Sequence, residues 1–301
     1  MLAFFMKNTE FFSMCVWLYR KKLVEAFLSD EKYIKYKYKR RIGFSPNLQN
    51  PESFTEKINW LKLNWHNPIL TQCADKYAVR KFVEARGAGA TLKKVYGVYK
   101  KPEDIDYTAL PQSFVLKVNH GCKQNIFCKN KNNFDSIYAN KLLNFYLKFS
   151  NYHRAREWAY KGITPCIICE EHLTSDESSM FEYNFYCYNG MPKLVEITYK
   201  ENPDTARTNM YDLNFNLLER KYKTLPLEFA PEKSKEYEQM LAYAKMLSQG
   251  FPFVRVDFFL VKNKIYFGEM TFYPISGIYK FNPISFDHFL GSFLELPKPL
   301  N

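Results

Sequence analysis

The sequence predicts an α+β protein in which helices and antiparallel sheets form subdomains around a cleft. Two observations lead to this prediction. Amphipathic helical patterns occupy the first third of the chain and recur later, and runs of β-branched and aromatic residues come in pairs separated by turns. With 301 residues, of which 47% are hydrophobic and 18% aromatic, the chain is long enough for two or three subdomains.

Residues 1–50 form a basic segment that is expected to be helical. It holds ten lysine and arginine residues against four carboxylates, which is half of the formal net charge of +12. The stretch KYIKYKYKRR within it fits a solvated basic helix, and it also fits a contact with a membrane surface or a phosphate backbone. The apolar run at 11–19 is too short to span a bilayer, and no signal cleavage site follows it.

Seven cysteines are odd in number and indicate no disulfide framework. The CxxC spacing at Cys166 and Cys169 lies in an apolar run without a second pair, so it predicts a buried strand rather than a zinc site. We therefore expect a cytoplasmic protein, and a peripheral position on the inner face of the membrane remains open.

Two amphipathic helices are predicted in residues 51–110, which we assign to an N-terminal helical or α+β subdomain. Ser53 and Glu56 form a capping box at the start of the first helix. Its apolar side consists of Phe54, Ile58, Leu61 and Trp65. The second helix follows in ADKYAVRKFVEARGAG, residues 74–89.

Residues 113–130 read as a strand, a polar loop and a second strand. Lys117 shares a face of the first strand with Val115 and Asn119, so a buried lysine there needs an anion. The loop at 120–125 could offer backbone N–H groups to phosphates, although its single glycine is a weak signal.

The following elements are a helical region at 135–160, an apolar strand at 164–173 that ends in Glu170 and Glu171, and a hairpin at 182–199. The hairpin turns at Asn189 and Gly190. A polar link over 200–225 and a helix at 233–249 precede a last hairpin.

The last hairpin, VRVDFFLVKNKIYFGEMTF at 254–272, carries charges inside an apolar pattern. If its turn is symmetric about Asn263, Asp257 faces Glu269. The same register pairs Arg255 with Thr271 and Phe259 with Phe267. Two facing carboxylates need a proton, a cation or solvent, and Mg²⁺ is a good candidate. Neutralisation by Arg255 or a lysine, or a solvated face, is the alternative.

Seven motifs follow one another along the chain: FTEKINWLKL, ADKYAVRKFVE, LPQSFVLKVNHG, REWAYKGITPCIICEEHL, EYNFYCYNGMPK, FPFVRVDFFLVKNKIYFGEMTFYPISG and FNPISFDHFLG. Together they resemble the TupA-like ATP-grasp family, which is associated with teichuronopeptide and capsular polysaccharide synthesis. The resemblance covers about residues 50–295. It implies an ATP-grasp fold, with two α+β lobes of antiparallel sheet that enclose a nucleotide cleft. Lobe 1 would span 111–173 and lobe 2 would span 174–301.

The resemblance also implies roles for individual residues, with ATP and Mg²⁺ as cofactors. Those assigned to the nucleotide are Lys117 for the α and β phosphates, His120, Gly121 and Lys123 in the covering loop, Glu170, Glu171 and Leu173 at the adenine, and Glu182 at the ribose. Asp257, Glu269 and Thr271 would hold the metal. Arg255 would stabilise the γ-phosphate during transfer, and Ser276 and Gly277 would contact the acyl phosphate.

This sequence departs from the family pattern at three places. Thr271 stands where an asparagine is common, and Asn184 stands where a lysine is usual. The loop reads His120-Gly121-Cys122-Lys123 in place of His-Gly-Ser-Gly.

The resemblance implies an ATP-dependent carboxylate–amine ligase that forms an amide through an acyl phosphate. Its partners would be a uronate-containing surface polysaccharide, or a precursor of it, and an amino acid or amine. We expect Arg207, Asn209 and Tyr211 to face the acceptor, because they lie between the two hairpins. A glycosyltransferase of the same pathways and a non-enzymatic membrane- or nucleic-acid-binding protein are the alternatives, and nucleic acid is not the expected partner.

Overall fold

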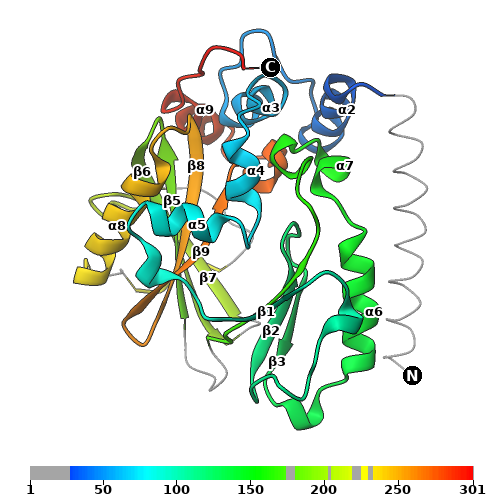
Figure 1. Ribbon diagram of the computed structural model, residues 1–301. Coiled ribbons are helices and arrows are strands. Elements are labelled where there is room, and N and C mark those ends of the chain that lie inside the picture. The colour runs from blue at the N-terminus through cyan, green and yellow to red at the C-terminus, as the bar shows by residue number, and fades with distance from the viewer. Residues whose placement is uncertain (1–27, 174–179, 203–204, 219–224, 230–232, 301) are drawn as a thin grey trace.

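The computed structural model describes residues 28–173, 180–202, 205–218, 225–229 and 233–300. Its architecture is α+β, with one four-stranded and one five-stranded antiparallel sheet (Figure 1). The apolar run predicted at 11–19 lies outside the described residues. Within them, no helix combines the length and apolar character needed to cross a membrane.

The first described helix is the basic one, α2 (Asp30–Ile42). It begins after Ser29, whose side chain accepts a hydrogen bond from the Lys32 N–H, and it ends at Gly43 in the left-handed region. Its buried side is formed by Ile34, Tyr38 and Ile42. The Tyr38 hydroxyl shares a 2.9 Å hydrogen bond with Thr55, so α2 is fixed against the next helix.

The predicted capping box opens α3 (Phe54–Asn64), because both reciprocal bonds between Ser53 and Glu56 are present. The short helices α4 (Ile69–Ala74) and α5 (Val79–Ala85) divide the second predicted helix at Asp75, whose carboxylate accepts the N–H groups of Tyr77 and Ala78. The 3₁₀ turns η1 (Gly89–Thr91) and η2 (Pro102–Asp104) follow.

The four-stranded sheet has the order β1-β4-β2-β3. Its strands are β1 (Val95–Tyr99), β2 (Phe114–Val118), β3 (Asn125–Cys128) and β4 (Ile167–Glu170). Because β1 pairs with β4, this lobe already includes residue 95, and the predicted boundary at 110 cuts through the sheet. The boundary at 173 falls between the two sheets.

A helix covers one face of this sheet. Leu143 of α6 (Ser136–Leu147) packs with Phe114 and Leu116 of β2. Lys117 points to the opposite face, as the alternation predicted, and we call that face the inner face of the sheet. The region predicted as helical at 135–160 contains two further short pieces, α7 (Asn151–Ala155) and η4 (Trp158–Tyr160). The 3₁₀ turn η3 (Lys131–Asn133) precedes α6.

The five-stranded sheet has the order β7-β6-β5-β8-β9. Its strands are β5 (Met180–Tyr188), β6 (Met191–Asn202), β7 (Thr205–Asp212), β8 (Phe253–Val261) and β9 (Lys264–Thr271). The polar link predicted at 200–225 was therefore wrong in part, because β7 is a strand of this sheet. The helix α8 (Lys235–Ser248) packs its Tyr237 and Tyr243 rings on one face, against Phe185 and Phe258.

We call the opposite face of this larger sheet its inner face. At one end of it α3 packs, with Phe54 5.0 Å from the Phe253 ring. The helix α9 (Ser285–Ser292) packs on α3, and the turn η5 (Pro274–Gly277) follows β9. The other end of the inner face is turned toward the four-stranded sheet.

The hairpin of β8 and β9 has the predicted pairs Arg255–Thr271 and Asp257–Glu269, whereas Phe267 faces Phe258 and not Phe259. The turn has two residues, Lys262 and Asn263, both with positive φ. A two-residue turn shifts the register by one, and a bulge between Asp257 and Phe258 shifts it back.

Candidate functional site

The inner face of the small sheet carries a buried ionic cluster. Lys117 is 7% exposed, and its Nζ lies 2.6 Å from Glu170 Oε1, which Lys93 Nζ also approaches to 3.0 Å. Burial and the neighbouring Lys93 lower the pKa of Lys117 to about 7, although Glu170 opposes this. Burial raises the pKa of Glu170, but the two lysines outweigh it and hold that pKa at about 2. An anionic ligand would find two ammonium groups here.

The inner face of the large sheet carries the opposed carboxylates. Asp257 is 2% exposed, and Arg255 binds it with two hydrogen bonds, Nε to Oδ1 at 2.7 Å and Nη2 to Oδ2 at 2.6 Å. Burial raises the pKa of Asp257 to about 7 against the opposing effect of Arg255. The Thr271 hydroxyl donates to Glu269 Oε1 at 3.2 Å. Arg255 thus neutralises Asp257, which is one of the predicted alternatives.

Two lysines that the sequence analysis did not single out connect the sheets. Lys76 Nζ lies 2.8 Å from Glu269 Oε2, and its main-chain N–H donates to the Asn119 carbonyl just after β2. Lys93 lies 5.3 Å above the ring of Phe259 on β8 while it pairs with Glu170 on β4. The inner faces of the two sheets therefore face each other, and these two lysine side chains lie between them.

The sequence held little signal for either lysine. Lys76 directly follows the helix-capping Asp75, and Lys93 precedes β1, but neither lies at a spacing that predicts a ligand. Only tertiary contacts place the two lysines between the sheets.

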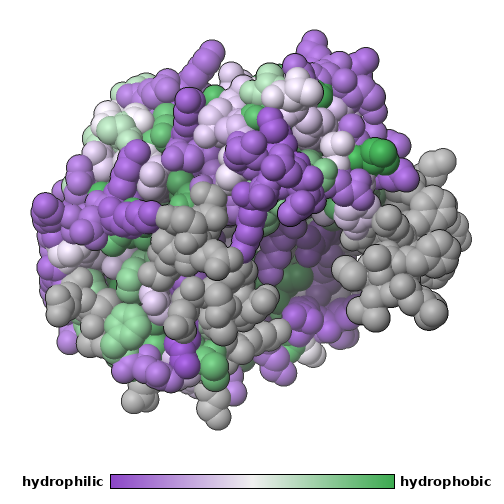
Figure 2. All heavy atoms as spheres, turned by 90° about the horizontal axis from the view of Figure 1, so that it is seen from below, coloured by the Kyte–Doolittle hydropathy of each residue, from purple (hydrophilic) through white to green (hydrophobic). Residues whose placement is uncertain are grey.

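Figure 2 shows a recess on the lower side of the molecule, lined by hydrophilic and hydrophobic residues.

The loop after β2 has an anchored start and an exposed tip. His120 is buried, its Nε2 donates to the Phe149 carbonyl at 2.7 Å, and burial lowers its pKa. A Cβ on Gly121 would lie 1.9 Å from Gln124 Oε1, so the chain folds tightly there. Lys123 is exposed and has positive φ. The structure thus gives His120 an anchoring contact and presents Lys123 at the tip.

The residues predicted at adenine and ribose have mixed surroundings. Glu170 is in the ionic cluster, whereas the Glu171 N–H donates to the Lys94 carbonyl at 2.9 Å. Leu173 is half-buried at the end of the described segment. Glu182 accepts a 2.8 Å bond from Lys200 and shares the inner face with Asp257.

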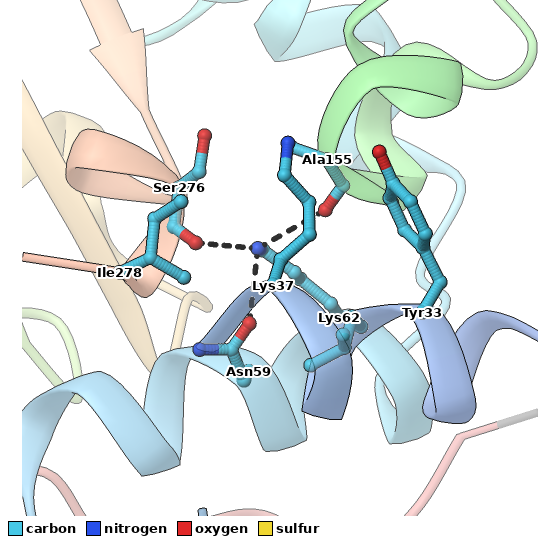
Figure 3. Close-up of a pocket in the computed structure, with 8 residues that line it drawn as sticks. Tyr33, Lys37, Asn59, Lys62, Ala155, Ser276 and Ile278 are labelled. Carbon is cyan, nitrogen blue, oxygen red and sulfur yellow. Dashed lines mark hydrogen bonds between the residues drawn. The ribbon is translucent and has the colours of Figure 1, made fainter. Parts of the chain in front are cut away.

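Ser276 and Gly277 lie in a separate polar cluster beyond β9. The Ser276 hydroxyl donates to Glu157 at 2.5 Å, and the Ser276 carbonyl accepts from Lys62 Nζ at 2.6 Å. Figure 3 shows Lys62 at the centre of this pocket, with further bonds to Asn59 and the Ala155 carbonyl. Burial lowers the pKa of Lys62 to about 8 and raises that of Glu157.

Tyr160 of η4 is buried, and burial, together with the charges of Glu157 and Glu269, raises the pKa of its hydroxyl. Ser276 itself is held by its hydrogen bond to Glu157.

The residues predicted to face the acceptor point the other way. Arg207, Asn209 and Tyr211 pair with Tyr199, Ile197 and Val195, which belong to the face under α8. Tyr211 contacts Phe215, which contacts Tyr237 of α8. The prediction is corrected because β7 is a strand, and strand alternation puts these three side chains opposite Asp257.

The residues at Asp257, Glu269 and Thr271 fit a magnesium ion. They offer only oxygen atoms, and Mg²⁺ in nucleotide enzymes is held by one or two carboxylates with phosphates and water. Among the described residues there is no group of three or more histidine, cysteine or acidic side chains that could hold a metal ion, so the site would depend on two carboxylates and a hydroxyl.

The profile of the TupA-like ATP-grasp family matches residues 56–295. The chain belongs to this family. As an ATP-grasp protein it is an ATP-dependent ligase, and its cofactors are ATP and Mg²⁺. The glycosyltransferase and non-enzymatic alternatives are set aside.

Solved structures similar to this TupA-like chain are remote in sequence, and no curated protein matches it. The D-alanine–D-alanine ligase of Bacillus anthracis has 13% identity and a TM-score of 0.44, with 84% of this chain and 85% of that chain covered. The corresponding ligase of Helicobacter pylori has 15% identity and a TM-score of 0.41, with 74% and 61% covered. An L-amino acid ligase of Bacillus licheniformis has 14% identity and a TM-score of 0.39, with 80% and 49% covered. This chain thus spans less than two thirds of the last two.

Proposed function

We propose that the protein joins a carboxylate to an amine as an amide. The observation that supports this most is the meeting of a lysine cluster on one sheet with an oxygen-lined carboxylate pair on the other, in a chain of the ATP-grasp family. Such a site can hold a triphosphate and its metal together. ATP, when bound, supplies the phosphoryl group that activates a carboxylate for displacement by the amine.

The residue roles follow from this arrangement. Lys117, Lys93 and Lys76 would bind phosphate oxygens, with Lys123 at the tip of the loop above them. Asp257, Glu269 and Thr271 would hold Mg²⁺. Arg255 would leave Asp257 and stabilise the charge of the transferring group, because phosphoryl transfer depends on positioning and charge neutralisation.

The carboxylate donor is proposed to be a uronic acid of a surface polysaccharide or of its precursor. The net charge of +12 supports an acidic substrate, because it favours encounter with anions. The same charge supports peripheral contact with an anionic membrane by a protein that its unpaired cysteines lead us to expect in the cytoplasm. The exposed cations of α2 would supply that contact: Lys32, Lys35, Lys39, Arg40 and Arg41.

The test is nucleotide binding followed by turnover. Calorimetric titration with a non-hydrolysable ATP analogue and Mg²⁺ should show binding that is at least about tenfold weaker in Asp257→Asn and in Glu269→Gln, since each removes one charged metal ligand. Glu238→Gln, an exposed change on α8, is the control. Unchanged affinity in both variants would refute the metal assignment.

Turnover is measured as phosphate release from ATP with uronic acids and a panel of amino acids. Release that needs both a carboxylate and an amine supports the ligase. Release of a nucleotide from a sugar donor, with no ADP formed, would contradict it.

A further inference from the structure

Asn184 is a buried polar residue to which the proposed function gives no role. It lies in β5 and pairs with Asp257 of β8, which pairs in turn with Glu269 of β9. Directly paired residues of neighbouring strands point to the same face of a sheet. Asn184 therefore lies on the inner face, next to Asp257 and on the side away from Glu269.

The amide oxygen of Asn184 lacks a donor. The residue is 4% exposed, and its Oδ1 is buried without a hydrogen-bond partner among the residues that the structure describes. A buried acceptor without a partner costs stability, so such atoms are rare unless water, an ion or a ligand satisfies them. Oδ1 thus needs an electropositive partner.

Two cations of the same face are paired with carboxylates rather than with Asn184. Arg255 donates to both oxygens of Asp257, at 2.7 and 2.6 Å. Lys76 Nζ lies 2.8 Å from Glu269 Oε2. These two cations compensate the acidic groups and leave the amide oxygen without a partner.

The proposed metal site has room for another oxygen ligand from the protein. Besides Asp257 and Glu269 it has only the hydroxyl of Thr271, which already donates to Glu269 Oε1 at 3.2 Å. Mg²⁺ takes six oxygen ligands, and amide carbonyl oxygens suit it as neutral donors. Asn184 Oδ1 is such an oxygen, in the position next to Asp257.

The pairing of Asn184 with Asp257 allows both to bind one ion. Facing Cβ atoms of paired strands are roughly 4.5–5.5 Å apart. Neighbouring oxygens around Mg²⁺, each at 2.0–2.1 Å from the ion, are about 2.9 Å apart. Because each of these two side chains has its oxygen two bonds beyond Cβ, the two oxygens can approach to that separation.

We propose that Asn184 Oδ1 is a further ligand of the Mg²⁺ ion that Asp257 holds. This inference rests on the metal site of the proposed function. Arg255, which leaves Asp257 for the transferring group in that proposal, frees the space next to both oxygens. Asn184 then fixes the ion on the β5 side of Asp257.

The first test is Mn²⁺ binding to the full chain by electron paramagnetic resonance, with and without a non-hydrolysable ATP analogue. Asn184→Leu removes the oxygen at similar size and should weaken Mn²⁺ binding by about tenfold, a loss found even for residues that only support a metal ligand. Asn184→Asp adds a charged oxygen and should tighten Mn²⁺ binding. Asn132→Leu, an exposed change on η3, is the matched control and should leave it unchanged.

A direct contact also has a spectroscopic signature. Asparagine labelled with ¹³C at its side-chain carbonyl should show a hyperfine coupling to bound Mn²⁺ in electron–nuclear double resonance. At saturating Mn²⁺ the coupling should be present in the unaltered protein and in Asn132→Leu, and absent in Asn184→Leu. No coupling in the unaltered protein, or the same coupling in Asn184→Leu, would overturn the proposal.

Thermal unfolding shows whether Asn184 acts only through the fold. A ligand raises the unfolding midpoint in line with its affinity, so the rise on adding Mg²⁺ should be smaller in Asn184→Leu. An equal rise would mean that Oδ1 meets only water, and it would overturn the proposal. If Asn184→Leu does not fold, Asn184→Asp, which keeps the shape, decides: unchanged or weaker Mn²⁺ binding contradicts the proposal.

Asp257→Asn separates this inference from the proposed function. If it leaves Mn²⁺ affinity unchanged, the metal assignment fails and the Asn184 ligand fails with it. If it weakens Mn²⁺ binding and Asn184→Leu does not, only the Asn184 ligand fails. If both weaken Mn²⁺ binding but the turnover assay forms no amide, the ligase function fails and the Asn184 ligand stands.

Discussion

Lys76 holds Glu269 in the position where a metal is proposed. Its ammonium group is 2.8 Å from that carboxylate, and burial lowers its pKa while Glu269 raises it more. Lys76 also keeps the pKa of Glu269 at about 2, with burial opposing it. If Mg²⁺ binds Glu269 as proposed, Lys76 would lose its partner to the metal and its ammonium group would become available to a phosphate.

Lys76→Met should therefore have two opposite effects. Without the competing ammonium, Mn²⁺ alone should bind more tightly in electron paramagnetic resonance titrations. The nucleotide analogue with Mg²⁺ should bind about tenfold more weakly, because one charged phosphate contact is lost. If the affinities for Mn²⁺ and for the nucleotide analogue both fall, Lys76 only supports the fold. The control is Lys81→Met, an exposed change on α5.

From the raised pKa of Asp257 we expect metal binding to depend on pH. Its pKa is raised to about 7 by burial, and a protonated carboxyl group does not bind Mg²⁺. Affinity should therefore rise as the pH increases through 7, and below 7 it should fall by up to about tenfold per pH unit. Glu269, with a pKa of about 2, contributes nothing in this range. Mn²⁺ titrations from pH 5.5 to 8.5 measure this, and a flat profile would contradict it.

Individual residues were predictable where strand alternation alone decides their face. Lys117 and the Asp257–Glu269 pair follow from period-2 geometry. Arg207, Asn209 and Tyr211 were misplaced because the segment read as a polar link, and a link has no alternation to apply. Lys76 and Lys93 were missed because only tertiary packing brings them to the two sheets.

At the scale of elements, the bulge in the last hairpin decides which residue of β9 faces Asp257. A two-residue turn alone would pair Asp257 with Gly268, and the bulge restores the pairing with Glu269. The sequence gives a weak hint, the glycine at 268 inside a strand pattern. The predicted register was right at the carboxylates because the shorter turn and the bulge cancel there.

Gly268→Ala should disturb that bulge. A Cβ at this position would lie 2.9 Å from the Asp257 carbonyl, so the backbone of Asp257 must move. We expect a loss of about 1–3 kcal/mol in the free energy of unfolding and a weaker Mg²⁺-nucleotide complex. Gly162→Ala is the control, since its Cβ would meet only Thr71 at 3.6 Å. Denaturant unfolding and calorimetry measure the two effects, and a Gly268→Ala protein equal to the control would contradict this account.

For the whole molecule, the antiparallel sheets and hairpins were predictable, and their mutual orientation was not. Each hairpin carries its own turn and alternation, which are local signals. The facing of the two inner faces depends on Lys93, which pairs with β4 and lies over a ring of β8, and on Lys76. Contacts between residues so far apart in the chain leave no periodic trace in the sequence.

Truncation of the N-terminus tests whether nucleotide binding depends on the basic segment. The residues proposed for phosphate and metal lie between 76 and 271, so removal of residues 1–27 should leave Mg²⁺-nucleotide affinity within about twofold. Removal of residues 1–42 should also lower the unfolding midpoint, because the buried side chains of Ile34, Tyr38 and Ile42 would be lost from the core, and each such side chain contributes about 1.5–3 kcal/mol.

The shorter truncation also tests the membrane contact. If residues 1–27 add to the exposed cations of α2 at a membrane, flotation with vesicles rich in phosphatidylglycerol should fall in the truncated protein and in salt, because the attraction between exposed charges is screened. Lys39→Glu with Arg40→Glu should lower flotation further while nucleotide binding stays unchanged, since both side chains are exposed and distant in sequence from the site. Equal flotation of all forms would show that this basic surface is solvated and has no lipid partner.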